Sequence, residues 1–359
     1  MKALRQYGKN RWLLFLFMSV CILMLQVYDN SWAVTYIYSD IMPPDWTSAA
    51  AYGINDRGEV VGGGTDSTGL SKGFIYDKGT YHELLPPDAT GATAYSINSS
   101  GVVVGDSSDG TLGKGFLYKG GTYKELLPSG YIESRARDIN NGGDVVGYGY
   151  NGSNWKGFIY SHETYAELLP SGWTDSYPWA INNKGDVVGW GYTNTGVTKG
   201  FLYSKGTYIE LLPEGLINAS AYGINNAGVV VGVGCCNEFG RGVGFIYEEG
   251  AYTFLMPPGW TYAGAYGINN SGVVVGRGYD KGFTYSEGEY TELLPPDWSW
   301  AYTQGINNKG DVVGWGQDAT GFRKGFIASD PVPEPSTMLL LGSGLIGLAG
   351  YGRRKFLKK

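Results

Sequence analysis

The sequence is poor in the residue types that most often carry enzyme chemistry. Its 359 residues include two histidines and three cysteines, and no GxSxG, HExxH or P-loop motif occurs. His82 occupies a variable strand position of the repeat described below, and His162 falls in a predicted turn. We therefore expect a protein that is not an enzyme and that holds no metal or cofactor. Carboxylates brought together from different repeats would give a glycosidase or lyase, which stays open as an alternative.

Disulfide chemistry has little support in this sequence. Cys21 lies in an N-terminal apolar segment, which leaves Cys235 and Cys236 as an adjacent pair. Adjacent Cα atoms are about 3.8 Å apart, shorter than the usual disulfide range. The simplest interpretation is two loop thiols without a role, and a strained disulfide or a redox function is the alternative.

Long helices in the body of the chain are disfavoured by its 59 glycines. Glycine costs about 1 kcal/mol relative to alanine at each helical position, whereas it suits tight turns between short strands. Apolar residues make up 43% of the chain, which is enough to build a core. The composition therefore predicts a folded, all-β body.

The net charge is positive only at the two ends of the chain. Residues 1–33 carry a net charge of +3 and residues 331–359 carry +4, so the overall −6 leaves −13 for residues 34–330. An acidic body lacks the basic surface that neutralises phosphates. Nucleic acid is therefore excluded as the expected partner.

Residues 1–33 have the features of a secretory signal peptide. A basic stretch precedes an apolar run over residues 12–27, and Ser31 and Ala33 place small residues before a predicted cut at Val34. An uncleaved signal helix is the alternative. A lipoprotein signal is rejected because Val20, before Cys21, is larger than the small residue that such signals carry.

Residues 331–359 combine three elements in a fixed order. A rigid, extended element comes first, made of Val332, Pro333, Glu334 and Pro335. An apolar run over residues 338–351 would form about 21 Å of helix, short against a bilayer core of about 30 Å. A basic stop follows at Arg353, Arg354 and Lys355. The pattern predicts a short transmembrane helix that holds the chain transiently in the membrane.

This tail resembles the PEP-CTERM sorting signal of Gram-negative bacteria. The resemblance implies that an exosortase-type membrane enzyme recognises Pro333, Glu334 and Pro335, and that the tail is removed. It also implies secretion through the inner membrane and transfer to the cell surface or the exopolysaccharide matrix. An ordinary tail anchor is the alternative.

The body repeats one unit seven times. The string Ile-Asn-x-x-Gly begins at spacings of 38 to 44 residues, at Ile54, Ile97, Ile139, Ile181, Ile224, Ile268 and Ile306. In the first unit, strands are predicted to cover residues 51–54, 59–62, 72–76 and 80–85, separated by turns. A four-stranded unit of about 42 residues is the size of a propeller blade.

The two ends of the repeat array complement each other. The last unit stops after its third strand, near Phe326, and residues 35–44 read as a fourth strand with no unit before it. Pairing these segments would close a ring and remove both open edges. We therefore predict that residues 34–330 form a seven-bladed β-propeller, with first strands innermost and fourth strands outermost.

The units also resemble the extracellular HAF repeat family. The His-Ala-Phe tripeptide of that family appears here as Lys-Gly-Phe, beginning at Lys72, Lys114, Lys156, Lys199, Lys281 and Lys324, with Val243 in the remaining unit. The resemblance implies an exported repeat protein and no particular biochemistry.

The expected ligand face carries the links between units and the second connections, which vary in length. Each link contains a position that follows a proline by about three residues, occupied by Trp46, Ala89, Tyr131, Trp173, Leu216, Trp260 and Trp298. The aromatic members are candidates for stacking on sugars at roughly 0.5–1.5 kcal/mol each, so that several weak contacts act together on a polymer. Packing between neighbouring blades is the alternative.

Two further repeated residues have structural interpretations. The seven Asn of the Ile-Asn-x-x-Gly strings suit turns, with a ring of metal ligands as the alternative. The Glu of the fourth strand recurs at the same position in five units, at Glu83, Glu125, Glu167, Glu210 and Glu292, which favours a structural role. The sequence thus predicts a surface-sorted propeller that binds polysaccharide, with a structural matrix component without a ligand as the first alternative.

Overall fold

The computed structural model describes residues 36–235 and 242–330, and the regular structure of this part consists of 28 strands. The predicted signal helix, the predicted transmembrane helix, the sorting motif and Cys236 lie outside the described residues. Among the described residues, no helix has the length and apolar character needed to cross a bilayer. The expected all-β body is confirmed.

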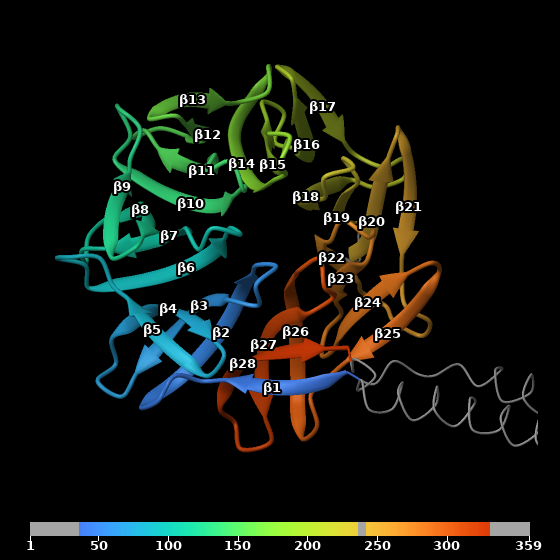
Figure 1. The fold of residues 1–359 in the computed structure, drawn as a ribbon. Coiled ribbons are helices and arrows are strands. Elements are labelled where there is room, and N and C mark those ends of the chain that lie inside the picture. The colour runs from blue at the N-terminus through green and yellow to red at the C-terminus, as the bar shows by residue number, and fades with distance from the viewer. Residues whose placement is uncertain (1–35, 236–241, 331–359) are drawn as a thin grey trace, which may run out of the picture. The chain divides into compact units, whose positions relative to one another are not determined.

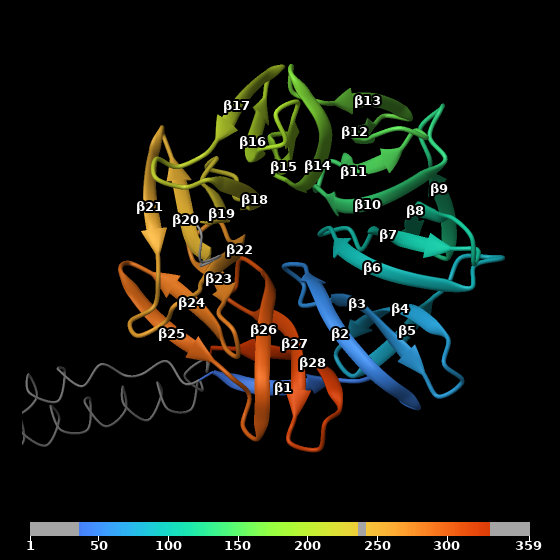
Figure 2. The ribbon, with the colours of Figure 1, turned by 180° about the vertical axis from the view of Figure 1, so that it is seen from behind.

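The strands form antiparallel sheets around a central axis, in a propeller-like arrangement (Figures 1 and 2). Five sheets have four strands. A sixth has eight, in which two sets of four antiparallel strands meet through one parallel pairing, Ser71 opposite Gly91.

The strands nearest the axis are the first strands of the repeats. They are β2 (Trp46–Ile54), β6 (Gly91–Ile97), β10 (Glu133–Ile139), β14 (Trp173–Ile181), β18 (Asn218–Ile224), β22 (Gly264–Ile268) and β26 (Trp298–Ile306). The second strands are β3 (Val60–Asp66), β7 (Val103–Ser108), β11 (Val145–Tyr150), β15 (Val187–Thr193), β19 (Val230–Cys235), β23 (Val274–Arg277) and β27 (Val312–Asp318).

The third and fourth strands complete each unit towards the outside. The third strands are β4 (Ser71–Asp77), β8 (Gly113–Lys119), β12 (Trp155–Ser161), β16 (Thr198–Ser204), β20 (Gly242–Glu248), β24 (Gly282–Ser286) and β28 (Arg323–Ser329). The outermost are β5 (Thr80–Leu84), β9 (Thr122–Leu126), β13 (Thr164–Leu168), β17 (Thr207–Leu211), β21 (Ala251–Leu255), β25 (Glu289–Leu293) and β1 (Ile37–Ile41).

The predicted pairing of the two ends is observed. β1 lies antiparallel to β28, with Asp40 opposite Phe326 and Ile41 opposite Gly325. Ile41 thereby takes the buried place that a leucine such as Leu84 holds in the other fourth strands. The sheet β1-β28-β27-β26 is thus built from both ends of the described chain.

Each unit contributes the same apolar layer to the core. A phenylalanine of the third strand is at most 2% exposed in every unit, at Phe74, Phe116, Phe158, Phe201, Phe245, Phe283 and Phe326. The glycine of each Val-Val-Gly string lies against the phenylalanine side chain of its own unit. At Gly62, an added Cβ would come within 2.0 Å of the Ala50 carbonyl oxygen and 2.7 Å of the Phe74 ring. Glycine is therefore required there by close packing.

A closed ring of hydrogen bonds joins the turns between the first and second strands of successive units. Each buried Asn donates from Nδ2 to the backbone carbonyl of the next Asn at 3.0–3.2 Å, in the order Asn55, Asn98, Asn140, Asn182, Asn225, Asn269, Asn307 and back to Asn55. The Oδ1 atom serves the same residue's own turn, as at Asn182, where it accepts from the N–H groups of Lys184 and Asp186. We call this the asparagine ring.

A second series of hydrogen bonds joins the same turns through the residue that follows each ring asparagine. The side chains of Asn141, Asn183, Asn226, Asn270, Asn308 and Asp56 each accept the backbone N–H of the equivalent residue in the preceding turn. These residues are more exposed than the asparagine ring. The turn interpretation of the repeated Asn therefore holds, and the same side chains also connect neighbouring sheets.

Replacing one member of the asparagine ring should weaken the whole fold. Asn182→Ala removes bonds to its own turn and leaves the Asn225 carbonyl without its donor, so we expect the free energy of unfolding to fall by about 2–4 kcal/mol. The matched control is Asn183→Ala, which removes one exposed bond and should cost less than about 1 kcal/mol. Urea denaturation measures both, and equal losses in the two variants would contradict the structural role of the ring.

Candidate functional site

The links between units and the second connections lie at the same end of the sheets, as the strand order predicts. Backbone hydrogen bonds join them directly, for example from the Asn194 N–H to the Gly172 carbonyl and from the Ala319 N–H to the Asp297 carbonyl. Six of the large hydrophobic residues that are exposed lie here: Leu112, Ile132, Tyr192, Ile217, Tyr279 and Phe322. We call this end the loop face.

Three of the predicted sugar-stacking residues are buried by neighbouring protein. Trp46, Trp173 and Trp298 are 7%, 6% and 8% exposed. Their rings meet Phe74, Phe201 and Phe326 edge-on, with centroids 5.8–6.0 Å apart. These contacts lie within one sheet rather than between neighbouring blades, and a buried ring has no free face for a sugar.

The other two members are less enclosed but make similar contacts. Trp260 packs against Phe283 at 5.8 Å and donates from Nε1 to Glu292 at 3.2 Å. Tyr131 donates from its hydroxyl to Glu167 at 3.3 Å. Both are half-buried, so a sugar-binding role for them stays a prediction.

The repeated Lys and Glu pair across the third and fourth strands. Lys72, Lys114, Lys156, Lys199 and Lys281 contact Glu83, Glu125, Glu167, Glu210 and Glu292 at 2.5–3.1 Å. Lys324 contacts Asp40, so β1 supplies the equivalent carboxylate. Lys199, with the Trp173 N–H, lowers the pKa of Glu210. The recurring Glu therefore has the structural role that its repetition favoured.

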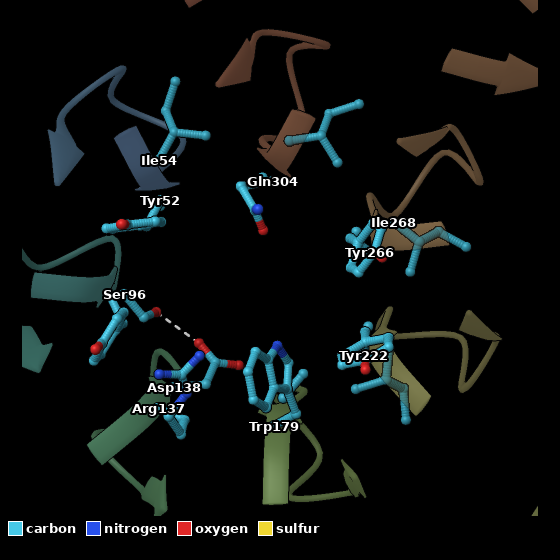
Figure 3. Close-up of a pocket in the computed structure, with 18 residues that line it drawn as sticks. Tyr52, Ile54, Ser96, Arg137, Asp138, Trp179, Tyr222, Tyr266, Ile268 and Gln304 are labelled. Atoms are coloured by element: carbon cyan, nitrogen blue, oxygen red, sulfur yellow. Dashed lines mark hydrogen bonds between the residues drawn. The ribbon is translucent and has the colours of Figure 1, made fainter. Parts of the chain in front are cut away.

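The inner strands line a central channel with side chains that sequence reasoning missed. Every inner strand has a register shift at the residue two before its isoleucine. Such a bulge turns the local strand and re-aims a side chain. The residues at the bulge are Tyr52, Tyr95, Arg137, Trp179, Tyr222, Tyr266 and Gln304, and they line a cavity of about 350 Å³ (Figure 3).

The aromatic residues of this channel contact one another around the ring. Tyr52 and Tyr95 lie 5.7 Å apart, Trp179 and Tyr222 5.3 Å, and Tyr222 and Tyr266 5.1 Å, measured between centroids. These phenols are neutral at physiological pH because the ordinary tyrosine pKa is about 10, and burial raises the pKa of Tyr52, Tyr95 and Tyr222 further. The channel wall therefore combines ring surfaces with neutral hydroxyl groups.

Arg137 is held between two of these rings. Its guanidinium carbon lies 4.0 Å from the centroid of Tyr95 and 3.9 Å from that of Trp179. Its Nε is buried and has no hydrogen-bond partner among the described residues. These two cation–π contacts hold the guanidinium in place and do not use its N–H groups as hydrogen-bond donors.

Asp138 follows Arg137 in β10 and lies beside the same cavity (Figure 3). It accepts from the Ser96 hydroxyl at 2.6 Å and from the Ile181 N–H at 2.8 Å. Withdrawal from bulk water raises its pKa to about 6, against the lowering effect of these bonds and of Arg137. The equivalent residues are Gly53, Ser96, Ala180, Gly223, Gly267 and Gly305, so Asp138 is specific to one unit.

The sequence held a signal for this site. Five of the seven residues two positions before the repeated isoleucine are aromatic, although a strand facing only a packed core would not need them. The bulge that points them to the axis cannot be read from the alternation of apolar residues. A smaller cavity of about 190 Å³ adjoins the channel and is lined by the asparagine turns.

A family model for the PEP-CTERM protein-sorting motif matches residues 331–355. No curated protein sequence matches the chain. Among solved structures, a catalytically inactive virginiamycin B lyase of Staphylococcus aureus with quinupristin superposes with a TM-score of 0.57 at 17% identity, covering 82% of this chain and 99% of the lyase. The β-propeller domain of the Trilobed protease from Pyrococcus furiosus gives 0.53 at 12%, covering 79% and 94%. These similarities establish a propeller-like fold.

Asp138 should make stability depend on pH. Its pKa is raised in the folded state, so folding favours the protonated form and the free energy of unfolding falls as pH rises from about 4 to 6. Relative to Asp138→Asn, the wild-type protein should lose about 2 kcal/mol across this window. Urea denaturation at several pH values measures the difference. Asp77→Asn, at an exposed hairpin turn, is the control, and parallel pH profiles for wild type and Asp138→Asn would contradict the effect.

Proposed function

We propose that this protein is an exported seven-bladed β-propeller that binds polysaccharide across its loop face and has no catalytic activity. The PEP-CTERM motif implies export and sorting to the cell surface in Gram-negative bacteria. Seven asparagines close one hydrogen-bond ring, and the eight-stranded sheet divides at a single pairing into two sets of four strands. Both observations support a count of seven blades.

The binding role is supported mainly by the exposed large hydrophobic residues, most of which lie on the loop face. Tyr279, Phe322 and Tyr192 are 64%, 52% and 39% exposed there. They are spread over three units, so each would offer one separate contact to a long polymer. One ring on a sugar contributes roughly 0.5–1.5 kcal/mol, which is short of the roughly 4 kcal/mol of millimolar binding. Repeated contacts along one polymer would supply the remainder.

The surface location defines the class of ligand. The proposal places the mature protein at the cell surface or in the exopolysaccharide matrix, after cleavage of the signal peptide at residue 33 and of the tail by an exosortase-type enzyme. Polysaccharide is the abundant polymer at that location. A structural component without a ligand and a glycosidase or lyase are the alternatives that the experiments below separate.

Loss of the loop-face rings should abolish polymer binding. A Tyr192→Ser, Tyr279→Ser, Phe322→Ser variant should bind cell-envelope polysaccharide at least tenfold more weakly in a glycan array or pull-down assay. The matched control is Ile37→Ser, Ile209→Ser, Phe254→Ser, which removes equally exposed residues from the outer strands and should bind as wild type. Absence of binding by the wild-type protein would favour the structural alternative, and release of reducing sugar would favour an enzyme.

The sorting motif should be needed for processing. A Pro333→Ala, Pro335→Ala variant removes the rigid element before the apolar run, so the chain should keep its tail and stay in the membrane fraction. Mass spectrometry of the C-terminus and cell fractionation measure the outcome. Val332→Ala, which leaves the Pro-Glu-Pro element intact, is the control, and normal release of the double variant would contradict the assignment.

A further inference from the structure

We propose that the central channel is a second binding site, separate from the loop face, for a carboxylated pyranose such as a hexuronic acid. The inner strands run from the links to the asparagine turns, so this cavity lies towards the end of the channel away from the loop face. This site lies on a different surface from the polymer-binding loop face and is independent of it.

The size and walls of the cavity suit one sugar ring. Its volume of about 350 Å³ falls within the range of small-molecule sites. Five of the seven bulge residues are aromatic, and Figure 3 shows Tyr52, Trp179, Tyr222 and Tyr266 around the central space. The C–H faces of a pyranose pack well on such rings, while the phenol hydroxyls, Ser96 and Gln304 can exchange hydrogen bonds with its hydroxyl groups.

The channel lining is less acidic than the body around it, because its one carboxylate is matched by one guanidinium. Residues 34–330 carry a net charge of −13, whereas the ionisable lining consists of tyrosines, Arg137 and Asp138. Arg277 is not part of the lining, although its guanidinium carbon lies 4.9 Å from the Tyr266 centroid. Among the described residues, Arg137 is the only lining group that can attract an anion, and its attraction is strongest when Asp138 is protonated.

The geometry of Arg137 supplies the recognition element. Its guanidinium carbon lies 4.0 Å from the Tyr95 centroid and 3.9 Å from the Trp179 centroid, and its Nε is buried without a partner among the described residues. Arg137 lines the cavity, and the terminal N–H groups of a guanidinium can donate two parallel bonds to a carboxylate. Lysine could not replace this arrangement, since it lacks the planar fork.

Asp138 adds a dependence on pH. The groups that face it are Ser96 and Tyr95 on β6, Arg137 on its own strand, Trp179 and the Ile181 N–H on β14, and across the channel Tyr52, Tyr222, Tyr266 and Gln304. Of these, only Asp138 changes charge near pH 6. Its neutral form removes repulsion from an anionic ligand, so binding should strengthen as pH falls from 7.5 to 5.

Calorimetric titration of the purified full chain with sodium D-glucuronate, sodium D-galacturonate, D-glucose and sodium acetate tests the site. At least one uronate should bind saturably, and D-glucose and acetate should each bind at least tenfold more weakly. Arg137→Gln should lower uronate affinity by roughly tenfold to a hundredfold. Arg57→Gln, which changes an exposed turn arginine, should have no effect.

Two further variants keep the test decisive if Arg137→Gln fails to fold. Gln304→Glu places a negative charge at the cavity and should weaken uronate binding about tenfold, and Asp138→Asn should bind at pH 7.5 as tightly as wild type does at pH 5. Failure of both uronates to bind, equal binding of D-glucose, or unchanged affinity in Gln304→Glu would overturn the proposal. The loop-face triple variant should still bind uronate, and loss there would also overturn it.

Discussion

Hydrogen bonds between consecutive asparagine turns fix the spacing of the sheets around the axis. Each Asn side chain uses its oxygen to shape its own turn and its nitrogen to hold the next one. These residues are only 3–5% exposed, so their bonds are largely protected from competition with bulk water. The channel depends on this ring, since the bulge residues lie two positions before the isoleucine that precedes each Asn.

The outer part of each unit depends on a different arrangement. A Lys–Glu pair joins the third and fourth strands, and a tryptophan from the link often donates to the same Glu. The unit with Val243 in place of Lys has Phe254 in place of Glu, so both members of the pair change together. Exposed ion pairs add little stability, and an apolar pair on the outer surface can replace one.

Much of the fold could be predicted because it repeats. The position of each strand, the order from inner to outer and the pairing of β1 with β28 follow from the spacing of Ile54 to Ile306 and from the incomplete end units. The site could not be predicted in the same way. Trp46 and Trp173 are buried because a phenylalanine of the same sheet packs against each of them. The direction of the Tyr52 and Arg137 side chains depends on a bulge in the inner strand. Neither contact leaves a periodic signal in the sequence.

Pairing of β1 with β28 has a consequence for biogenesis. The two strands are separated by almost the whole folded body, since Lys324 and Asp40 lie 284 residues apart. Contacts at such separation form late, so an exported chain passes through a stage in which β28 is an open edge. During that stage β1 of a second molecule fits the same edge. Crowded secretion would therefore produce strand-exchanged dimers or chains, and the local concentration of newly exported protein sets the yield of closed monomers.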